Sequence, residues 1–414
     1  MSTDQSPALS PVLSEAPIEL RNQTYEDLTE LMQQLGEKRY RGEQLFRWVH
    51  ARGVTDLDQM TDVSRTLRAR LRGENLVRVA ELQIDKVQLS ADGTRKLRLK
   101  TADNRLIESV LIPDDDARRA ALGRAAEART PDAYDDDEDE VWERKKLTQC
   151  VSSQVGCAID CDFCATAKLG FGRNLSAGEI VSQVYQAEAL LRSLPTDDPT
   201  RLAGGDQVTN LVFMGMGEPL HNIDNLMRSL RILLHPLGRS FSRRRITVST
   251  AGLVPAIERL GREGLPVNLA VSLNASSDAV RDVIMPINRR YPLKDLLGAL
   301  RRFPLDRRQR ITIEYVLLGG LNDSLEDARR LPDLLRGIPC KLNLIPWNPH
   351  PQASYQRPEQ RAVLAFQAEC MKLGFVTYIR KTRGDDIDAA CGQLAAENDP
   401  RAGRQKPGRL PILS

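Results

Sequence analysis

After Lys146 the chain alternates short apolar runs with longer amphipathic segments, and this alternation limits its possible folds more than any other feature. The apolar runs predict strands at 149–154, 210–214, 245–249, 267–272, 311–317 and 341–345. The amphipathic segments predict helices at 177–192, 222–234, 254–263, 293–303, 323–336 and 358–373. Such units form parallel sheets with right-handed crossovers. Six units are too few for a closed eight-stranded barrel, so the pattern predicts an α/β partial barrel or an open doubly wound sheet.

Residues 18–79 predict a small helical module. Apolar residues recur at helical spacing in three stretches, which begin near Tyr25, Leu45 and Met60, and Gly36 is the expected C-cap of the first helix. The module is unusually basic, with Lys38, Arg39, Arg41, Arg47, Arg52, Arg65, Arg68, Arg70 and Arg72. We expect one cationic face suited to a polyanion such as a nucleic acid, although a solvated basic surface is the ordinary interpretation of such a pattern.

Between the module and the alternating region, the apolar period changes to two. Residues 80–113 predict a β-meander with a turn at Asp92-Gly93. Residues 114–146 predict a mobile acidic surface insertion, because seven acids lie between Asp132 and Glu140 and no apolar period continues there. Lys and Arg outnumber Asp and Glu 59 to 56 in the whole chain, but 59 to 49 outside that acidic run. Such an excess suits a polyanionic partner.

The composition at both ends of the chain indicates tails, and the sequence gives no sign of a membrane segment. Residues 1–17 are rich in Ser and Pro and are expected to be disordered, and residues 397–414 form a second tail. The N-terminus lacks the basic start and apolar core of a signal peptide. No run of about 18 apolar residues exists to span a membrane. We therefore expect a cytoplasmic protein.

Seven cysteines in a large cytosolic chain favour metal or redox chemistry over a disulfide framework. Cys157, Cys161 and Cys164 have C-x3-C-x2-C spacing on a loop that follows the first predicted strand. Three thiolates suit an iron–sulfur cluster with one iron open to another ligand. The alternative is structural zinc, which usually takes four closed ligands, and the strand residue Cys150 is poorly placed as a fourth.

This cysteine loop resembles that of the radical S-adenosylmethionine superfamily. Further segments narrow the resemblance to the RlmN/Cfr family of RNA adenine methyltransferases, namely CVSSQVGC at 150–157, GMGEPL at 215–220, NLIPWN at 343–348 and RGDDIDAACGQL at 383–394. The resemblance implies a partial (β/α)6 radical-SAM barrel over residues 147–396 with a C-terminal catalytic cysteine loop. The acidic insertion has no place in the family pattern.

The resemblance also implies a set of cofactor-binding residues. Cys157, Cys161 and Cys164 would hold a [4Fe–4S] cluster whose open iron chelates S-adenosylmethionine. Gly217 and Glu218 match the motif that binds the methionine ammonium, although a turn with an exposed acid would look the same. The other implied cofactor contacts lie near later strand ends, where polar residues are common, and are Ser249, Ser272, Leu273, Asn274 and Asn348.

Three further residues have catalytic roles in the family. The cysteine that matches Cys391 is methylated by one S-adenosylmethionine, and a radical derived from a second makes that methyl the carbon donor. The cysteine that matches Cys150 then attacks Cys391, forms a transient disulfide and releases the product. Glu108 matches a proton acceptor. Taken alone, Cys391 would be an inert core residue and Glu108 a solvent-facing residue of an alternating strand.

The resemblance implies methylation at adenine C2 in the peptidyl-transferase centre of 23S ribosomal RNA, and beside the anticodon of transfer RNA. The amino-acid sequence of residues 383–391 and the long basic N-terminus are similar to those of the C2 branch of the family. An electron donor such as flavodoxin is implied as a partner, and a monomer is expected. The alternatives are C8 methylation of the Cfr type, another radical enzyme such as a maturase, and a zinc-stabilised RNA-binding protein without catalysis.

Overall fold

The computed structural model describes residues 16–113, 146–198, 200–201 and 205–396. The expected N-terminal tail (1–17) and acidic insertion (114–146) lie outside the described residues except for residues 16, 17 and 146, and the tail from 397 onward lies wholly outside them. Among the described helices, none has the length and apolar character needed to cross a membrane.

A single ten-stranded sheet organises most of the molecule. In spatial order its strands are β14 (Thr377–Ile379), β13 (Cys340–Pro346), β12 (Ile311–Leu317), β11 (Asn268–Ser272), β10 (Ile246–Thr250), β9 (Asn210–Phe213), β6 (Leu147–Cys150), β5 (Leu106–Pro113), β4 (Arg95–Lys100) and β3 (Gln83–Leu89). The strands from β6 to β14 pair in parallel, as the alternating pattern predicts. Strands β5, β4 and β3 continue the sheet in antiparallel register.

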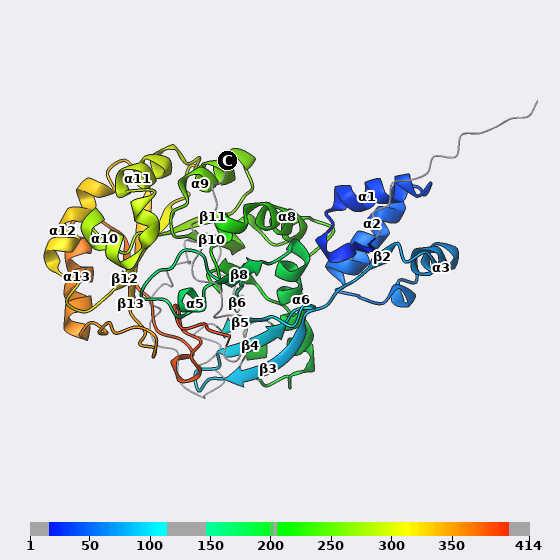
Figure 1. Ribbon diagram of the computed structural model, residues 1–414, viewed down its shortest axis with the longest axis horizontal. Helices are drawn as coiled ribbons and strands as arrows, with labels where there is room; N and C mark the ends of the chain where they lie inside the picture. Colours follow the sequence, from blue (N-terminus) through cyan, green and yellow to red (C-terminus); the bar gives the residue numbers. More distant parts are fainter. Residues whose placement is uncertain (1–15, 114–145, 199, 202–204, 397–414) are drawn as a thin grey trace, which may run out of the picture.

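Helices follow the parallel strands and lie on the outside of the curved sheet (Figure 1). They are α6 (Ala177–Ser193), α8 (Ile223–Leu234), α9 (Val254–Glu263), α10 (Asp278–Ile284), α11 (Leu293–Arg302), α12 (Leu325–Leu334) and α13 (Gln360–Lys372). Local signals set their limits: a capping box at Ser176 starts α6, and Gly264, with a left-handed φ of 63°, ends α9. The predicted partial (β/α)6 barrel is confirmed.

The meander belongs to the barrel sheet. Val110 of β5 pairs with Cys150 of β6, so the antiparallel strands extend the parallel ones without a break. The sequence also predicts a strand that continues to residue 154, and this prediction is wrong. The chain leaves the sheet after Cys150, and β7 (Gln154–Gly156) pairs instead with β8 (Phe171–Asn174).

The N-terminal helices surround a hydrophobic core of their own, which includes Leu28, Phe46 and Leu67. They are α1 (Tyr25–Gln34), α2 (Tyr40–Phe46) and α3 (Arg65–Gly73), and the short parallel pair β1 (Ile18–Glu19) and β2 (Val77–Arg78) lies beside them. Met60 and Val63 are buried but precede α3, which starts after the N-cap Ser64, so the expected helix from Met60 is shorter than predicted. In Figure 1 these helices lie at the opposite end of the molecule from α12 and α13.

Buried polar residues join the N-terminal helices to α6 of the barrel, and we call this contact the junction. Arg21 is 1% exposed and donates to Ser182 Oγ at 3.0 Å and to the Gly53 carbonyl at 3.3 Å. His50 is fully buried, with Nδ1 2.8 Å from the Tyr185 hydroxyl. Burial lowers the pKa of His50 to about 3, so its imidazole is neutral.

Candidate active site

A cavity of about 900 Å³ opens where the parallel strands end at their carboxyl termini. Parallel α/β folds place their sites at this edge, because the loops that follow successive strands meet there. The predicted site residues that line the cavity are Cys157, Cys161, Cys164, Gly217, Glu218, Ser249, Ser272, Asn274 and Cys391. Residues separated by more than 230 positions in the chain therefore share one cavity.

The three cysteines of the C-x3-C-x2-C motif lie on the loop between β7 and the short helix α5 (Ala165–Lys168). A tight approach of two backbone segments fixes the start of this loop. Gly156 has a φ of 73°, and a Cβ there would lie 1.8 Å from the Gly170 carbonyl, which also accepts from the Cys157 N–H at 2.9 Å. Only glycine fits at this position.

The cysteine loop is fastened to the segment that follows β13. The Phe163 carbonyl lies 3.0 Å from both Trp347 Nε1 and His350 Nε2, and the Tyr355 hydroxyl donates to Asp162 Oδ2 at 2.7 Å. A loop held by this many bonds presents its thiols in a fixed arrangement, which a preorganised metal site requires.

The thiols suit a cluster that supplies positive charge. Burial is the main cause that raises the pKa values of Cys157, Cys161 and Cys164 above the usual range. Nearby thiols add to the shift: Cys164 for Cys157 and Cys161, and Cys391 for Cys164. Bound iron reverses this balance, because coordinated thiols are deprotonated. Within the described chain, no three His, Cys, Asp or Glu side chains converge closely enough to hold a single metal ion. In an iron–sulfur cluster each thiolate binds a different iron, so three thiols along one cavity wall fit a [4Fe–4S] cluster.

Glu218 provides a buried anion on the same cavity. It is 4% exposed, and its carboxylate accepts the N–H groups of Leu220 at 3.0 Å and Ala251 at 2.7 Å. Burial raises its pKa to about 7, against these hydrogen bonds. The adjacent Gly217 has a φ of 100°, and a Cβ there would lie 2.5 Å from Gln154. An ammonium ligand would offset the cost of burying this carboxylate.

The strand ends beyond Glu218 add hydroxyl and amide groups. Ser249 Oγ donates to Glu314 Oε2 at 2.9 Å, and Asn274, with a φ of 57°, accepts the Val316 N–H at 2.9 Å. Leu273 differs from the prediction, because its side chain is fully buried and does not line the cavity. Only its backbone is available as a contact.

Two residues near the cavity escaped the sequence analysis. Glu314 lines the cavity from the middle of β12, where a single acid among apolar residues gives no distinctive signal. Arg281 is fully buried and donates to the carbonyls of Leu273 at 2.9 Å and Ala251 at 2.7 Å. It ties the loops after β10 and β11 together, and one arginine in a helix could not have indicated that role.

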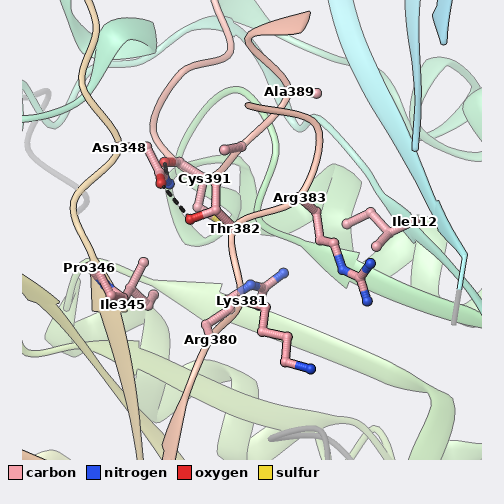
Figure 2. A pocket seen from close by; sticks show the side chains of 11 residues that line it. Ile112, Ile345, Pro346, Asn348, Arg380, Lys381, Thr382, Arg383, Ala389 and Cys391 are labelled. Atoms are coloured by element: carbon pink, nitrogen blue, oxygen red, sulfur yellow. Dashed lines mark hydrogen bonds between the residues drawn. The ribbon is translucent and has the colours of Figure 1, made fainter. Parts of the chain in front are cut away.

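Cys391 lines both this cavity and a second, smaller one of about 320 Å³. Figure 2 shows the residues that line the smaller cavity, Cys391 among them. The smaller cavity is lined by the basic segment Arg380, Lys381 and Arg383, and also by Asn348. Asn348 Nδ2 donates to the Cys391 carbonyl at 3.2 Å, and the Thr382 hydroxyl donates to Asn348 Oδ1 at 3.0 Å. We call the smaller cavity the cationic pocket. Asn348 thus contacts the loop that carries Cys391, which we call the Cys391 loop, from the side of this pocket.

Cys150 and Glu108 are buried beside the site and line neither cavity. Burial raises the pKa of the Cys150 thiol to about 12; the nearby Cys391 raises it further and Arg380 opposes the shift. Glu108 is 2% exposed and pairs with Lys96 at 3.4 Å, so it is not the solvent-facing residue that alternation alone would suggest. All seven cysteines are free thiols.

Comparison with known proteins identifies the class that this fold and site define. Residues 151–331 match the model of the radical SAM superfamily, and residues 18–77 match that of the ribosomal RNA large subunit methyltransferase N-terminal domain. The crystal structure of a radical SAM methyltransferase from Sphaerobacter thermophilus is similar, with a TM-score of 0.77, 40% identity, and coverage of 92% of this chain and 100% of that one. The protein is a radical S-adenosylmethionine enzyme that uses a [4Fe–4S] cluster and S-adenosylmethionine.

Curated relatives identify the family to which the chain belongs within this class of enzymes. The dual-specificity RNA methyltransferase RlmN of Anaeromyxobacter dehalogenans is 46% identical over 95% of this chain and 96% of its own length. Its counterpart in Geobacter sulfurreducens is also 46% identical, over 92% of this chain and 93% of its own. The chain belongs to the RlmN family of dual-specificity RNA methyltransferases, as the motifs predicted.

Proposed function

We propose that the protein methylates C2 of an adenine in the peptidyl-transferase centre of 23S ribosomal RNA and C2 of the adenine 3′ of the anticodon in transfer RNA. Cys391 delivers the carbon. The observation that carries this proposal is the position of Cys391, which lies at the boundary between the cavity with the three motif cysteines and the cationic pocket. A residue that carries carbon from a cofactor to RNA must reach both.

The residues of the larger cavity divide the binding of the cofactors. Cys157, Cys161 and Cys164 hold the cluster, and Glu218 binds the ammonium of S-adenosylmethionine while Gly217 lets the backbone turn closely past Gln154. Ser249, Ser272 and Asn274 supply further contacts from the larger cavity. Asn348, which lines the smaller pocket, and the backbone of Leu273 are cofactor contacts that the family resemblance implies. When bound, the cluster and S-adenosylmethionine supply the methyl group and the one-electron chemistry that activates it.

RNA approaches from the cationic pocket. Arg380, Lys381 and Arg383 bind phosphates beside the target nucleotide, because cationic side chains supply most of the affinity for a nucleic-acid backbone. The basic helices of residues 18–79 offer a second set of cationic side chains for the RNA. Such contacts fix the position of the RNA and leave the choice of base to the shape of the site.

Cys150 and Glu108 act after carbon transfer. Glu108 takes the proton from the target carbon, and the electron pair of that C–H bond stays with the ring. The Cys150 thiolate then attacks the sulfur of Cys391: a Cys150–Cys391 disulfide forms, the bond between Cys391 Sγ and the carrier carbon breaks, and its electron pair leaves with that carbon, which takes up a proton and becomes the methyl group. A thiol reductant returns both cysteines to thiols for the next turnover. The Cys150 thiol needs help to ionise, because burial raises its pKa to about 12, and Arg380 favours its thiolate. The species that attacks sulfur is the thiolate and not the thiol, so this charge supports the resolving step.

The same proposal includes the setting of the reaction. A reduced flavodoxin-like protein donates the electron, and the enzyme works as a monomer in the cytoplasm. Because the cluster must be reduced for each turnover, we expect activity to depend on the concentration of that donor. Size-exclusion chromatography with light scattering tests the monomer.

The decisive experiment replaces Cys150 with Ala. The variant should transfer carbon to RNA but fail to release it, so labelled RNA should remain on the protein in a denaturing gel, attached to Cys391 on peptide mass analysis. Cys391→Ala should trap nothing, and the double variant should behave like Cys391→Ala. Cys370→Ala is the matched control, since Cys370 is a fully buried cysteine on α13 away from the site. Multiple turnover by Cys150→Ala would contradict the resolving role.

C8 methylation remains the second candidate within the RlmN/Cfr family. Digestion of the product RNA and mass analysis of its nucleosides separate 2-methyladenosine from 8-methyladenosine. A C8 product would overturn the assignment of the carbon position while leaving the role of Cys391 intact.

A further inference from the structure

Lys96 is a buried ammonium that the mechanism above does not use. It lies on β4 and is 5% exposed. Its Nζ is 3.4 Å from Glu108 Oε1, and the side chains of the two residues are only 6% and 3% exposed. The same Nζ donates to the Asp388 carbonyl at 3.2 Å. One buried cation therefore connects the proposed proton acceptor to a residue three positions before Cys391.

The sheet register places Lys96 among the catalytic groups. Lys96 pairs with Val110, and Val110 pairs with Cys150 across the next strand. Paired residues of neighbouring strands lie on the same face of a sheet, and residues two apart along a strand also share a face. Glu108 is two residues before Val110. Lys96, Glu108 and Cys150 therefore lie on one face of the sheet, the face toward the Cys391 loop.

Anchoring the Cys391 loop does not by itself require a cation at this position. Asp386 accepts from Ser90 Oγ at 2.5 Å and from the Ala91 N–H at 3.0 Å, and the Gly384 N–H donates to Asp92 at 3.1 Å. These bonds already attach the loop to the turn between β3 and β4. A buried ammonium costs stability unless paired, and replacing a buried ion pair by apolar residues is often neutral. The charge of Lys96 is therefore best explained by the charge of Glu108.

We propose that Lys96 is a positioning residue, which keeps the Glu108 carboxylate ionised and turned toward the Cys391 loop. The inference rests on the roles of Glu108, Cys150 and Cys391 in the proposed function. In the step that Lys96 supports, the Glu108 carboxylate takes the proton from the target carbon and becomes a carboxylic acid, while the electron pair of the broken C–H bond stays with the ring. A neighbouring ammonium favours the ionised form that can accept this proton.

The test compares Lys96→Met and Lys96→Arg with the wild-type holoenzyme in single-turnover reactions with RNA. Three quantities are followed: S-methylation of Cys391, the RNA–protein adduct and the methylated product. Lys96→Met should methylate Cys391 at the wild-type rate but lose product formation by about tenfold, with adduct accumulating. Lys96→Arg should restore most of the product rate, because it keeps the charge. An equal loss of Cys391 methylation and product, or no effect of Lys96→Met, would overturn the proposal.

A double-mutant comparison covers the case in which Lys96→Met folds poorly. If Lys96 acts through Glu108, then adding Lys96→Met to Glu108→Gln should change the product rate no further. This double variant buries no charge at the pair, so it should fold better than Lys96→Met alone. Additive losses would overturn the inference. Failure of the proposed function has a different signature, namely no adduct and no methylated RNA with the wild-type protein.

Discussion

The junction and the larger cavity both bury ionisable side chains, but they satisfy them differently. At the junction, Arg21 and His50 find their partners within the chain. On the cavity, Glu218 forms no ion pair with any described residue, and burial raises the pKa values of Glu218 and of the three motif cysteines. The buried groups of the junction therefore stabilise the fold, whereas Glu218 and the motif cysteines of the cavity are left for ligands to pair with.

The largest effect that would break this comparison is at Cys161. If the thiols of the cavity serve only ligands, Cys161→Ala should abolish cluster binding and all S-adenosylmethionine cleavage while it changes the free energy of unfolding by less than about 1 kcal/mol. Iron analysis after anaerobic reconstitution and urea unfolding measure the two quantities. Cys340→Ala is the control, since Cys340 lies on β13 and lines neither cavity. Full iron content in Cys161→Ala would refute the ligand assignment.

Arg21→Met tests the opposite region. It removes hydrogen bonds to Ser182 and Gly53 and should lower the free energy of unfolding by about 3 kcal/mol. Cleavage of S-adenosylmethionine per folded molecule should not change. The exposed Arg47 offers a control in the same helices, and Arg47→Met should cost less than about 0.5 kcal/mol. A loss of cleavage activity in folded Arg21→Met would show that the two regions are not independent.

Glu218→Gln should weaken the binding of S-adenosylmethionine by about 30-fold, or about 2 kcal/mol, because a charge-assisted bond to the ammonium is lost. Equilibrium binding to the cluster-loaded protein measures this change. Glu188→Gln is the matched control: Glu188 is also buried, but it pairs with Arg239. That variant should lose stability and keep its affinity for the cofactor. Equal affinities of Glu218→Gln and the wild type would remove Glu218 from the cofactor site.

The smallest effect is a pH dependence at the junction. The unfolded chain protonates His50 near pH 6.5, but in the folded protein burial lowers its pKa to about 3. Its contribution to stability is complete well above pH 6.5 and is lost as the pH falls, by about 1 kcal/mol between pH 6.5 and 5.5. His50→Gln should remove that part of the slope in urea unfolding at several pH values. An unchanged slope would assign the acid sensitivity to another group.

Sequence alone placed five of the barrel strands close to their observed positions, because these are short runs rich in apolar and β-branched residues. It extended the first strand too far, to residue 154, and it did not predict β14. The predicted strand at 311–317 and the observed β12 coincide, and α9 coincides with its predicted range. The pairing of β5 with β6 could not be predicted in the same way. Alternation indicates which residues of a strand face the core but not which strand lies beside it, so the meander was expected as a separate unit.

The candidate site shows a similar division. The thiol spacing was visible because cluster chemistry demands it, whereas Gly217 and Glu218 were identified through the family resemblance. Glu314, Arg281 and Lys96 were not, since each acts through contacts with residues distant in the chain. A single charged residue in a strand or helix carries no pattern by itself. The roles assigned to Cys150 and Glu108 stay predictions, and their burial is the feature that the structure adds.

The bonds between Asp386 and the turn at Ser90 and Ala91 join segments 295 and 296 residues apart. Contacts of such long sequence separation form late, because the intervening chain must be ordered first. A ribosome releases the N-terminal strands well before the Cys391 loop. During synthesis Cys150 is therefore present for most of the time without its partner, and the reactive pair is assembled only when almost the whole chain has emerged. Because Cys391 follows the barrel strands in the sequence, the Cys150–Cys391 pair cannot react until the strands that enclose it have been synthesised.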